Sequence, residues 1–189
     1  MILAHAGHRI DKTDQPGCRF PAGRVGSVYR RVYMYLLERR PAGVVSAAAS
    51  GADLVVLRAA EDLFIPFHIA LPLPIDEFRR RSVDDRGADW SEAFDRAITR
   101  ASAVVVADGL LDHDDWFRRG NDFILDTAAD LAVNGKTGIT AGGVGHRPSI
   151  EALAIVTSTP AAAGSTTADF FAKARRRGWP VHTIDPLTD

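Results

Sequence analysis

The chain of 189 residues is 46% hydrophobic and carries a formal net charge of −1. This length and apolar content predict a single domain over residues 1–189 with a substantial core, and the balanced charge excludes a global electrostatic attraction to nucleic acid or to an anionic membrane. The lone Cys18 excludes an internal disulfide framework and a multi-cysteine metal site, which fits a reducing compartment. Because no uncharged run approaches the roughly 20 residues of a membrane span and no signal peptide precedes His8, we expect a cytoplasmic protein without a membrane partner.

Apolar runs of strand length alternate with helical stripes along the chain. The run 103–107 (AVVVA) is continuous, as in a buried strand, whereas Val25–Arg39 places apolar residues three and four positions apart. In chain order, the predicted elements are strand 2–6, helix 25–39, strand 43–47, helix 52–63, strand 65–71, helix 91–101, strand 103–107, helix 117–133, strand 152–156, helix 168–177 and strand 179–184. The glycine-rich segment 134–148 is predicted to be a flexible lid or a surface excursion.

The alternation of elements also predicts the fold class. Near-continuous apolar strands separated by helices indicate a mainly parallel sheet with helices on both faces. Because the crossovers in such sheets are right-handed, we expect an α/β fold, a single doubly wound, Rossmann-like sandwich. Ligands bind beyond the carboxyl ends of the strands in these sheets. The loops expected at that edge are 7–9, 46–53, 73–82, 107–114 and 157–169.

The first of these loops, in the sequence AGHRI, contains Gly7, His8 and Arg9 directly after the first predicted strand. The glycine permits a tight turn, which would direct His8 and Arg9 over the edge of the sheet. The planar guanidinium group suits a bidentate contact with phosphate. A surface salt bridge to a neighbouring carboxylate is the alternative interpretation of Arg9.

The second loop, SAAASGAD, joins the second predicted strand to a helix. Gly51 stands just before this helix, where the absence of a Cβ would allow a special backbone conformation or the close approach of a ligand. Asp53 is interpreted as an N-cap, which stabilises a helix by about 1 kcal/mol. Alternatively, Asp53 or Ser46 forms a hydrogen bond with a sugar hydroxyl or a base.

The third loop, GSTTADFF, leads from the strand 152–156 into the last helix. Gly164, Ser165, Thr166 and Thr167 would present backbone N–H groups and hydroxyls to a phosphate at the positive end of that helix. Asp169 is expected in its first turn, either as a carboxylate favoured by the helix dipole or as a group placed near a sugar. This loop therefore predicts a phosphorylated ligand.

The six histidines lack the spacing of a metal site, because neither HExxH nor HxH occurs. A metal centre is therefore not expected, and the sequence predicts no cofactor. The basic run 173–177 (KARRR) is interpreted as a solvated helix end. A nucleic-acid patch is the weaker alternative because no aromatic residues are interleaved with these charges.

Three segments together resemble the SLOG superfamily, which contains LOG-type phosphoribohydrolases, the DNA-processing protein A family and YpsA-like proteins. They are AGHRI at 6–10, VVSAAASGADLVVLRAA around the second strand, and GSTTADFFAKARRRGWPVHTID near the end. The second is similar to a loop of the DNA-processing group, and the third to a loop and helix of YpsA-related chains. LPLPIDEFRRRSV at 71–83 and WFRRGNDFILDTAADL at 116–131 also look like YpsA-related sequence.

The resemblance implies a Rossmann-like fold that binds a nucleotide or a nucleotide-derived ligand. It implies a sensor or accessory protein; the alternatives are a LOG-like hydrolase of nucleoside 5′-monophosphates and, less favoured, a DNA-binding protein. In LOG enzymes a P-G-G-x-G-T-x-x-E loop supplies the catalytic glutamate. Here Ser165 and Thr166 replace the doubled glycines, and Asp169 is the tentative catalytic residue. The resemblance also implies a homo-oligomer formed through helices beside the sheet.

Overall fold

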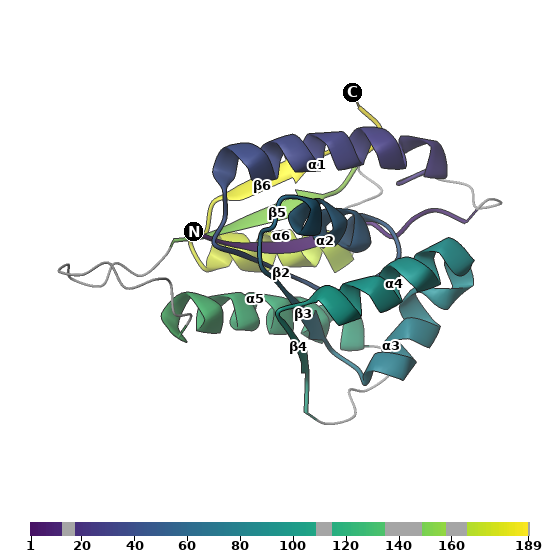
Figure 1. Ribbon diagram of the computed structural model, residues 1–189. Helices are drawn as coiled ribbons and strands as arrows, with labels where there is room; N and C mark the ends of the chain where they lie inside the picture. Colours follow the sequence, from purple (N-terminus) through teal and green to yellow (C-terminus); the bar gives the residue numbers. More distant parts are fainter. Residues whose placement is uncertain (13–17, 109–114, 135–148, 158–165, 189) are drawn as a thin grey trace.

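The computed structural model describes residues 1–12, 18–108, 115–134, 149–157 and 166–188. Its centre is a six-stranded sheet with the order β4-β3-β2-β1-β5-β6, in which every pair of neighbouring strands is parallel (Figure 1). The strands are β1 (Ile2–Gly7), β2 (Gly43–Ser46), β3 (Phe67–Leu71), β4 (Ala103–Val106), β5 (Ile150–Ile155) and β6 (Val181–Ile184).

The strand order reverses direction beside β1. The chain moves outward from β1 through β2 and β3 to β4, and then returns to the other side of β1 to form β5 and β6. Strand β1 pairs with β5 along its whole length, from Ile2 opposite Ile150 to Gly7 opposite Ile155. The helices that follow β1 and β5 lie on opposite faces of the sheet, which creates the crevice where doubly wound sheets bind ligands.

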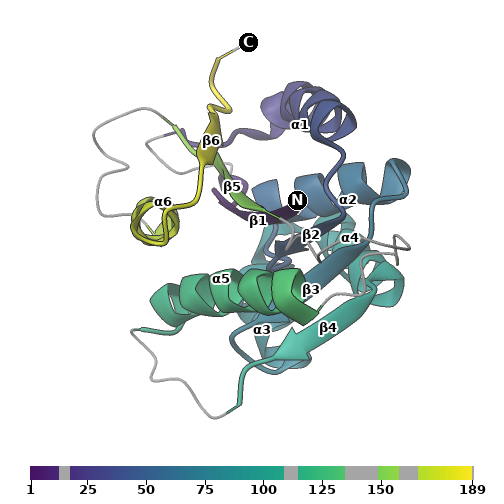
Figure 2. The same ribbon diagram turned by 90° about the vertical axis from the view of Figure 1, so that its left-hand side faces the viewer.

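Helices cover both faces of the sheet (Figure 2). Helices α1 (Val25–Arg39), α2 (Ala52–Asp62) and α4 (Ala88–Arg100) lie on one face, and α5 (Trp116–Asn134) and α6 (Thr166–Arg176) lie together on the other. A shorter helix, α3 (Ile75–Ser82), follows β3. Single turns of 3-10 helix occupy 22–24 and 84–86. None of the helices in the described parts of the chain is long and apolar enough to cross a membrane.

The core lies between these layers. Strand β2 is entirely buried, and α1 contributes Val28, Val32 and Leu36, which are spaced four residues apart and therefore share one face. Helix α2 is buried on most of its surface because it lies in the middle of its layer, between α1 and α4. Strand β4, at the edge of the sheet, remains partly exposed.

These findings confirm the predicted doubly wound, parallel, Rossmann-like α/β fold. Every predicted strand and helix has a counterpart, with ends that differ by a few residues. Helix α3 was missed, because its sequence IDEFRRRS buries only Phe78 and Ser82 and follows Pro74, which reads as a loop signal. The segment 134–148, predicted as a lid or surface excursion, lies outside the described residues except for Asn134, which ends α5.

Candidate ligand-binding site

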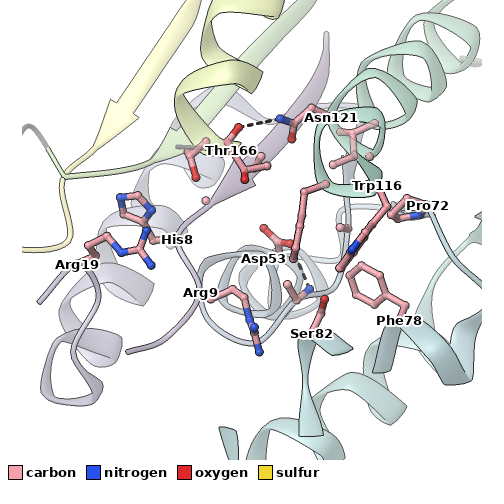
Figure 3. A pocket seen from close by; sticks show the side chains of 18 of the residues that line it. His8, Arg9, Arg19, Asp53, Pro72, Phe78, Ser82, Trp116, Asn121 and Thr166 are labelled. Carbon is pink, nitrogen blue, oxygen red and sulfur yellow. Dashed lines mark hydrogen bonds between the residues drawn. The ribbon is translucent and has the colours of Figure 1, made fainter. Parts of the chain in front are cut away.

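A cavity of about 270 Å³ opens at the carboxyl edge of the sheet. Its walls come from the segments after β1, β2 and β3 and from the first turns of α5 and α6 (Figure 3). The cavity thus lies at the crevice that the strand order creates, and most of the loops expected at this edge contribute to it.

Two glycines allow the backbone segments behind the cavity to approach closely. Gly51 has a φ of 116°, and a Cβ there would lie 2.4 Å from the backbone nitrogen of Ile10. A Cβ on Gly7 would lie 2.3 Å from the Cβ of Ala52. Because of this close packing, the N–H of Ala52 donates to the carbonyl of His8, and that of Ile10 donates to the carbonyl of Ser50. The start of α2 therefore holds the segment 8–10 in place.

Three arginines form one end of the cavity. Arg9, Arg19 and Arg86 all line it, whereas Asp53 is the only carboxylate among the described residues of the lining. Arg86 donates from Nε to the carbonyl of Ile10 at 2.8 Å, which anchors its guanidinium group beside the segment that carries Arg9. This end is consequently suited to an anion.

Asp85 balances part of this positive charge from outside the cavity lining. Its carboxylate pairs with the guanidinium groups of Arg9 and Arg86 and lies 3.4 Å from Lys12 Nζ. Burial would raise the pKa of Asp85, but Arg9 and Arg86 outweigh it and hold the pKa below its ordinary value. Arg9 therefore forms the salt bridge that the sequence left as an alternative, and it also lines the cavity.

His8 and the start of α6 lie beside the arginines. Burial, together with the charge of Arg19, lowers the pKa of His8 to about 4, so the ring is neutral near pH 7. Its Nε2 lies 3.4 Å from the hydroxyl of Thr157. Thr166 and Thr167 open α6 and line the cavity, so the positive end of the helix dipole faces the same space.

Aromatic side chains form the opposite end of the cavity. Trp116 packs edge-on against Phe78, with ring centroids 6.3 Å apart, and stacks on Phe117 at 3.6 Å. Trp116 is nearly buried, whereas Phe117 is 42% exposed. Pro72 completes this wall and packs against Gly120, where a Cβ would lie 3.2 Å from the Pro72 Cγ. This end offers a flat apolar surface of the kind that stacks with a planar ring.

Asp53 lies on the cavity wall and is only 6% exposed. Its Oδ2 accepts a hydrogen bond from the N–H of Ala49 at 3.2 Å, and its Oδ1 lies 3.5 Å from His5 Nδ1. Burial raises the pKa of Asp53 to about 7, although the amides of Ala49 and Gly7 and the charge of Arg9 oppose this rise. The N-cap interpretation of Asp53 is wrong, because Gly51 occupies the N-cap position of α2.

Ser46 and His5 form a buried layer behind Asp53. Both are fully buried, and His5 Nδ1 lies 3.0 Å from Ser46 Oγ. Burial lowers the pKa of His5 to about 3, so its ring is neutral at ordinary pH. Ser46, predicted as a ligand-binding residue, is not among the lining residues and contacts the site only through this layer.

We predict that Asp53→Asn stabilises the protein in a pH-dependent way. Between the ordinary pKa of 3.8 and about 7, folded wild-type protein holds a proton that the unfolded chain has released, so its stability falls as pH rises through this window. Asparagine has no such proton and can still accept from Ala49. The melting temperatures should therefore be similar near about pH 4 and should separate toward about pH 8, with the variant higher.

Thermal melts of the two proteins across this pH range test the prediction. His5 and His8 also titrate abnormally, but they are common to both proteins and largely cancel in the difference. A difference that is constant with pH would mean that Asp53 has an ordinary pKa in the folded state.

Asp169 lies between α5 and α6 and is not among the lining residues. Its Oδ2 accepts from Asn121 Nδ2 at 3.0 Å and lies 2.8 Å from Lys173 Nζ. Burial opposes ionisation, but the hydrogen bonds from Lys173 and Asn121 outweigh it and lower the pKa of Asp169. Asn121 also donates to the carbonyl of Thr166 at 2.7 Å. Asp169 thus helps hold the start of α6 against α5, and its catalytic assignment stays a prediction.

The structure brings some of the predicted site residues together and separates others. Those that line the cavity are Gly7, His8, Arg9, Asp53, Thr166 and Thr167. Gly51, Ser46 and Asp169 lie behind or beside it, and Gly164 and Ser165 lie outside the described residues. The sequence interpretation missed Arg19, Arg86 and the aromatic end. The pair Trp116–Phe117, at the start of a helix on the ligand edge, was the available signal.

Comparisons with known proteins give a likeness to a solved structure. No protein-family model and no curated protein matches the chain. Among solved structures, the chain is similar to DNA processing protein A (DprA) from Streptococcus pneumoniae, with 15% sequence identity and a TM-score of 0.45. The match covers 97% of this chain and 58% of that protein, so this chain spans less than two thirds of its length.

Proposed function

We propose that this chain binds a nucleotide or a nucleotide-derived ligand in the cavity, as a sensor or accessory protein. The observation that carries the proposal is the pairing, in one cavity, of three arginines with an aromatic wall. Phosphate requires cationic donors and a base requires a flat apolar surface, and a nucleotide is the common ligand that presents both. The motif order that resembles the SLOG superfamily supports the same class of ligand.

In the proposed orientation, the phosphate lies at the arginine end and the base at the aromatic end. Arg9 and the backbone N–H groups at the start of α6 would contact the phosphate. Phe117, with its exposed ring, would stack against the base. The site would then bind the base through stacking on its ring. Because every base has a π-face, stacking alone does not distinguish one base from another.

Binding without cleavage is favoured over hydrolysis. A LOG-like phosphoribohydrolase would require a carboxylate at the N-glycosidic bond. The tentative catalytic residue Asp169 does not line the cavity, and its carboxylate is engaged with Lys173 and with the lining residue Asn121. The predicted homo-oligomer and the absence of a nucleic-acid partner stay predictions.

The proposal is tested by calorimetric titration with nucleoside 5′-monophosphates, the matching nucleosides and inorganic phosphate. The nucleotides should bind more tightly than either part alone. Phe117→Ala should weaken nucleotide binding by about 5-fold to 150-fold, because base stacking contributes about 1–3 kcal/mol. Phe64→Ala is the matched control, since Phe64 is 94% exposed and precedes β3 at the opposite edge of the sheet.

Two outcomes would contradict the proposal. If no nucleotide binds, or if the two phenylalanine variants bind alike, the cavity is not a nucleotide site of this kind. Chromatography of the same mixtures detects free base. If the wild-type protein released free base, the chain would be an N-glycosidic hydrolase.

A further inference from the structure

Asp53 occupies the middle of the cavity, between its two ends. Figure 3 shows it with His8 and Arg19 on one side and Trp116 and Phe78 on the other. In a nucleotide the sugar connects the phosphate to the base. A nucleotide that places its phosphate at the arginine end and its base at the aromatic end therefore sets its sugar beside Asp53.

The cavity wall holds polar groups whose hydrogen-bonding capacity is unused. Among the described residues, five buried side-chain atoms have no hydrogen-bond partner. Three of them, Asp53 Oδ1, Arg9 Nε and Ser82 Oγ, belong to residues that line the cavity; the other two are His5 Nε2 and the Tyr35 hydroxyl. Buried polar atoms are nearly always hydrogen-bonded in folded proteins, so each exception requires an explanation. Three exceptions around one cavity are explained together if a polar ligand occupies it.

The chemistry of these groups indicates which part of the ligand they contact. Above its pKa of about 7 the Asp53 carboxyl group is ionised. An ionised carboxylate only accepts hydrogen bonds, and it has about four lone-pair sites on two oxygens. The Ala49 amide uses one site on Asp53 Oδ2, and the Gly7 amide also acts on this carboxylate. The remaining capacity suits two neighbouring hydroxyl donors, which are the 2′- and 3′-hydroxyls of a ribose. The Ser82 hydroxyl can donate or accept and can therefore complement either of them.

We infer that Asp53 is a specificity-determining residue that accepts hydrogen bonds from the ribose hydroxyls, so that the site selects ribonucleotides over their deoxy counterparts. This inference rests on the proposed nucleotide binding. His5 and Ser46 lie behind the carboxyl group and are fully buried, so they restrict its rotation. A carboxylate held in one orientation discriminates between ligands more sharply than a mobile one.

The experiment compares one ribonucleoside 5′-monophosphate with its 2′,3′-dideoxy counterpart at a pH above the Asp53 pKa of about 7, where the carboxyl group is ionised. Wild-type protein should bind the ribose form about 10-fold to 150-fold more tightly, the range expected for hydrogen bonds to a charged group. In Asp53→Asn the ratio should fall toward one, mainly through weaker binding of the ribose form. Binding of the dideoxy form should change little. Asp89→Asn, which makes the same change at an exposed position in α4, should keep the wild-type ratio.

The outcomes separate the inference from the proposed function. Equal binding of both nucleotides by the wild-type protein would overturn the role of Asp53 while leaving nucleotide binding intact, and it requires no variant to fold. An unchanged ratio in Asp53→Asn would overturn it as well. If neither nucleotide binds, both the inference and the proposed function fail.

Discussion

Replacing Gly51 with alanine is expected to destabilise the fold by about 2–6 kcal/mol. Two effects add. The backbone conformation, with φ of 116° and ψ of −127°, is one that residues with a Cβ adopt at a cost of about 1–3 kcal/mol. The new Cβ would also lie within 2.4–2.8 Å of backbone atoms of residues 8–10, and such overpacking costs about 1–3 kcal/mol. Urea unfolding measures the sum.

Gly87→Ala is the matched control for this prediction. Gly87 also has a positive φ, of 106°, but a Cβ there meets nothing within 4 Å. Its replacement should therefore show the conformational cost alone and be the milder of the two. An equal loss of stability in the two variants would mean that the contact between Gly51 and the segment 8–10 has no energetic consequence.

The same contact connects stability to the site. The segment pressed by a new Cβ at position 51 carries His8 and Arg9, both of which line the cavity. If the backbone relaxes to relieve the clash, these side chains move with it. Gly51→Ala should therefore also weaken ligand binding, whereas Gly87→Ala should not.

The sequence predicts the fold well because the decisive interactions are local. A strand such as β2 is buried on both faces and is therefore a continuous apolar run, and α1 shows its buried face in the spacing of Val28, Val32 and Leu36. Helix α3 lacks such a signal. Most of its residues are charged, and it forms where Phe78 can pack against Phe94 and Trp116, contacts that are distant in sequence.

The candidate site is predicted less completely for the same reason. Gly7 ends β1, Arg9 follows it closely and Thr166 opens the helix after β5, so the strand order brings them to the ligand edge. Arg86 reaches the cavity only because the 3-10 turn at 84–86 lies beside Ile10. Asp169 has the right position in its helix but points to Lys173, a choice made by the packing of α5 against α6. Such placements depend on tertiary contacts that sequence spacing does not encode.

Arg9→Ala is expected to weaken binding of a nucleoside monophosphate by about 10-fold to 150-fold, which corresponds to the 1.5–3 kcal/mol of a hydrogen bond to a charged group. Arg9 lines the arginine end of the cavity, and its partner Asp85 lies outside the lining. The loss should concern the phosphate. Affinity for the matching nucleoside, which has no phosphate, should hardly change, so the ratio of the two affinities falls. Calorimetric titration of both ligands measures this ratio.

Two further variants make the test of Arg9 decisive. Arg100→Ala removes the same charge from a 65% exposed position at the end of α4 and should leave the ratio unchanged. Asp85→Asn removes the anion that competes with phosphate for Arg9, so nucleotide affinity should rise. Salt screens the repulsion between the Asp85 carboxylate and the phosphate. At low salt this repulsion is stronger, so the rise in nucleotide affinity should be larger. If Arg9→Ala lowered nucleoside and nucleotide affinity equally, Arg9 would support the cavity wall through Asp85 and would not bind phosphate.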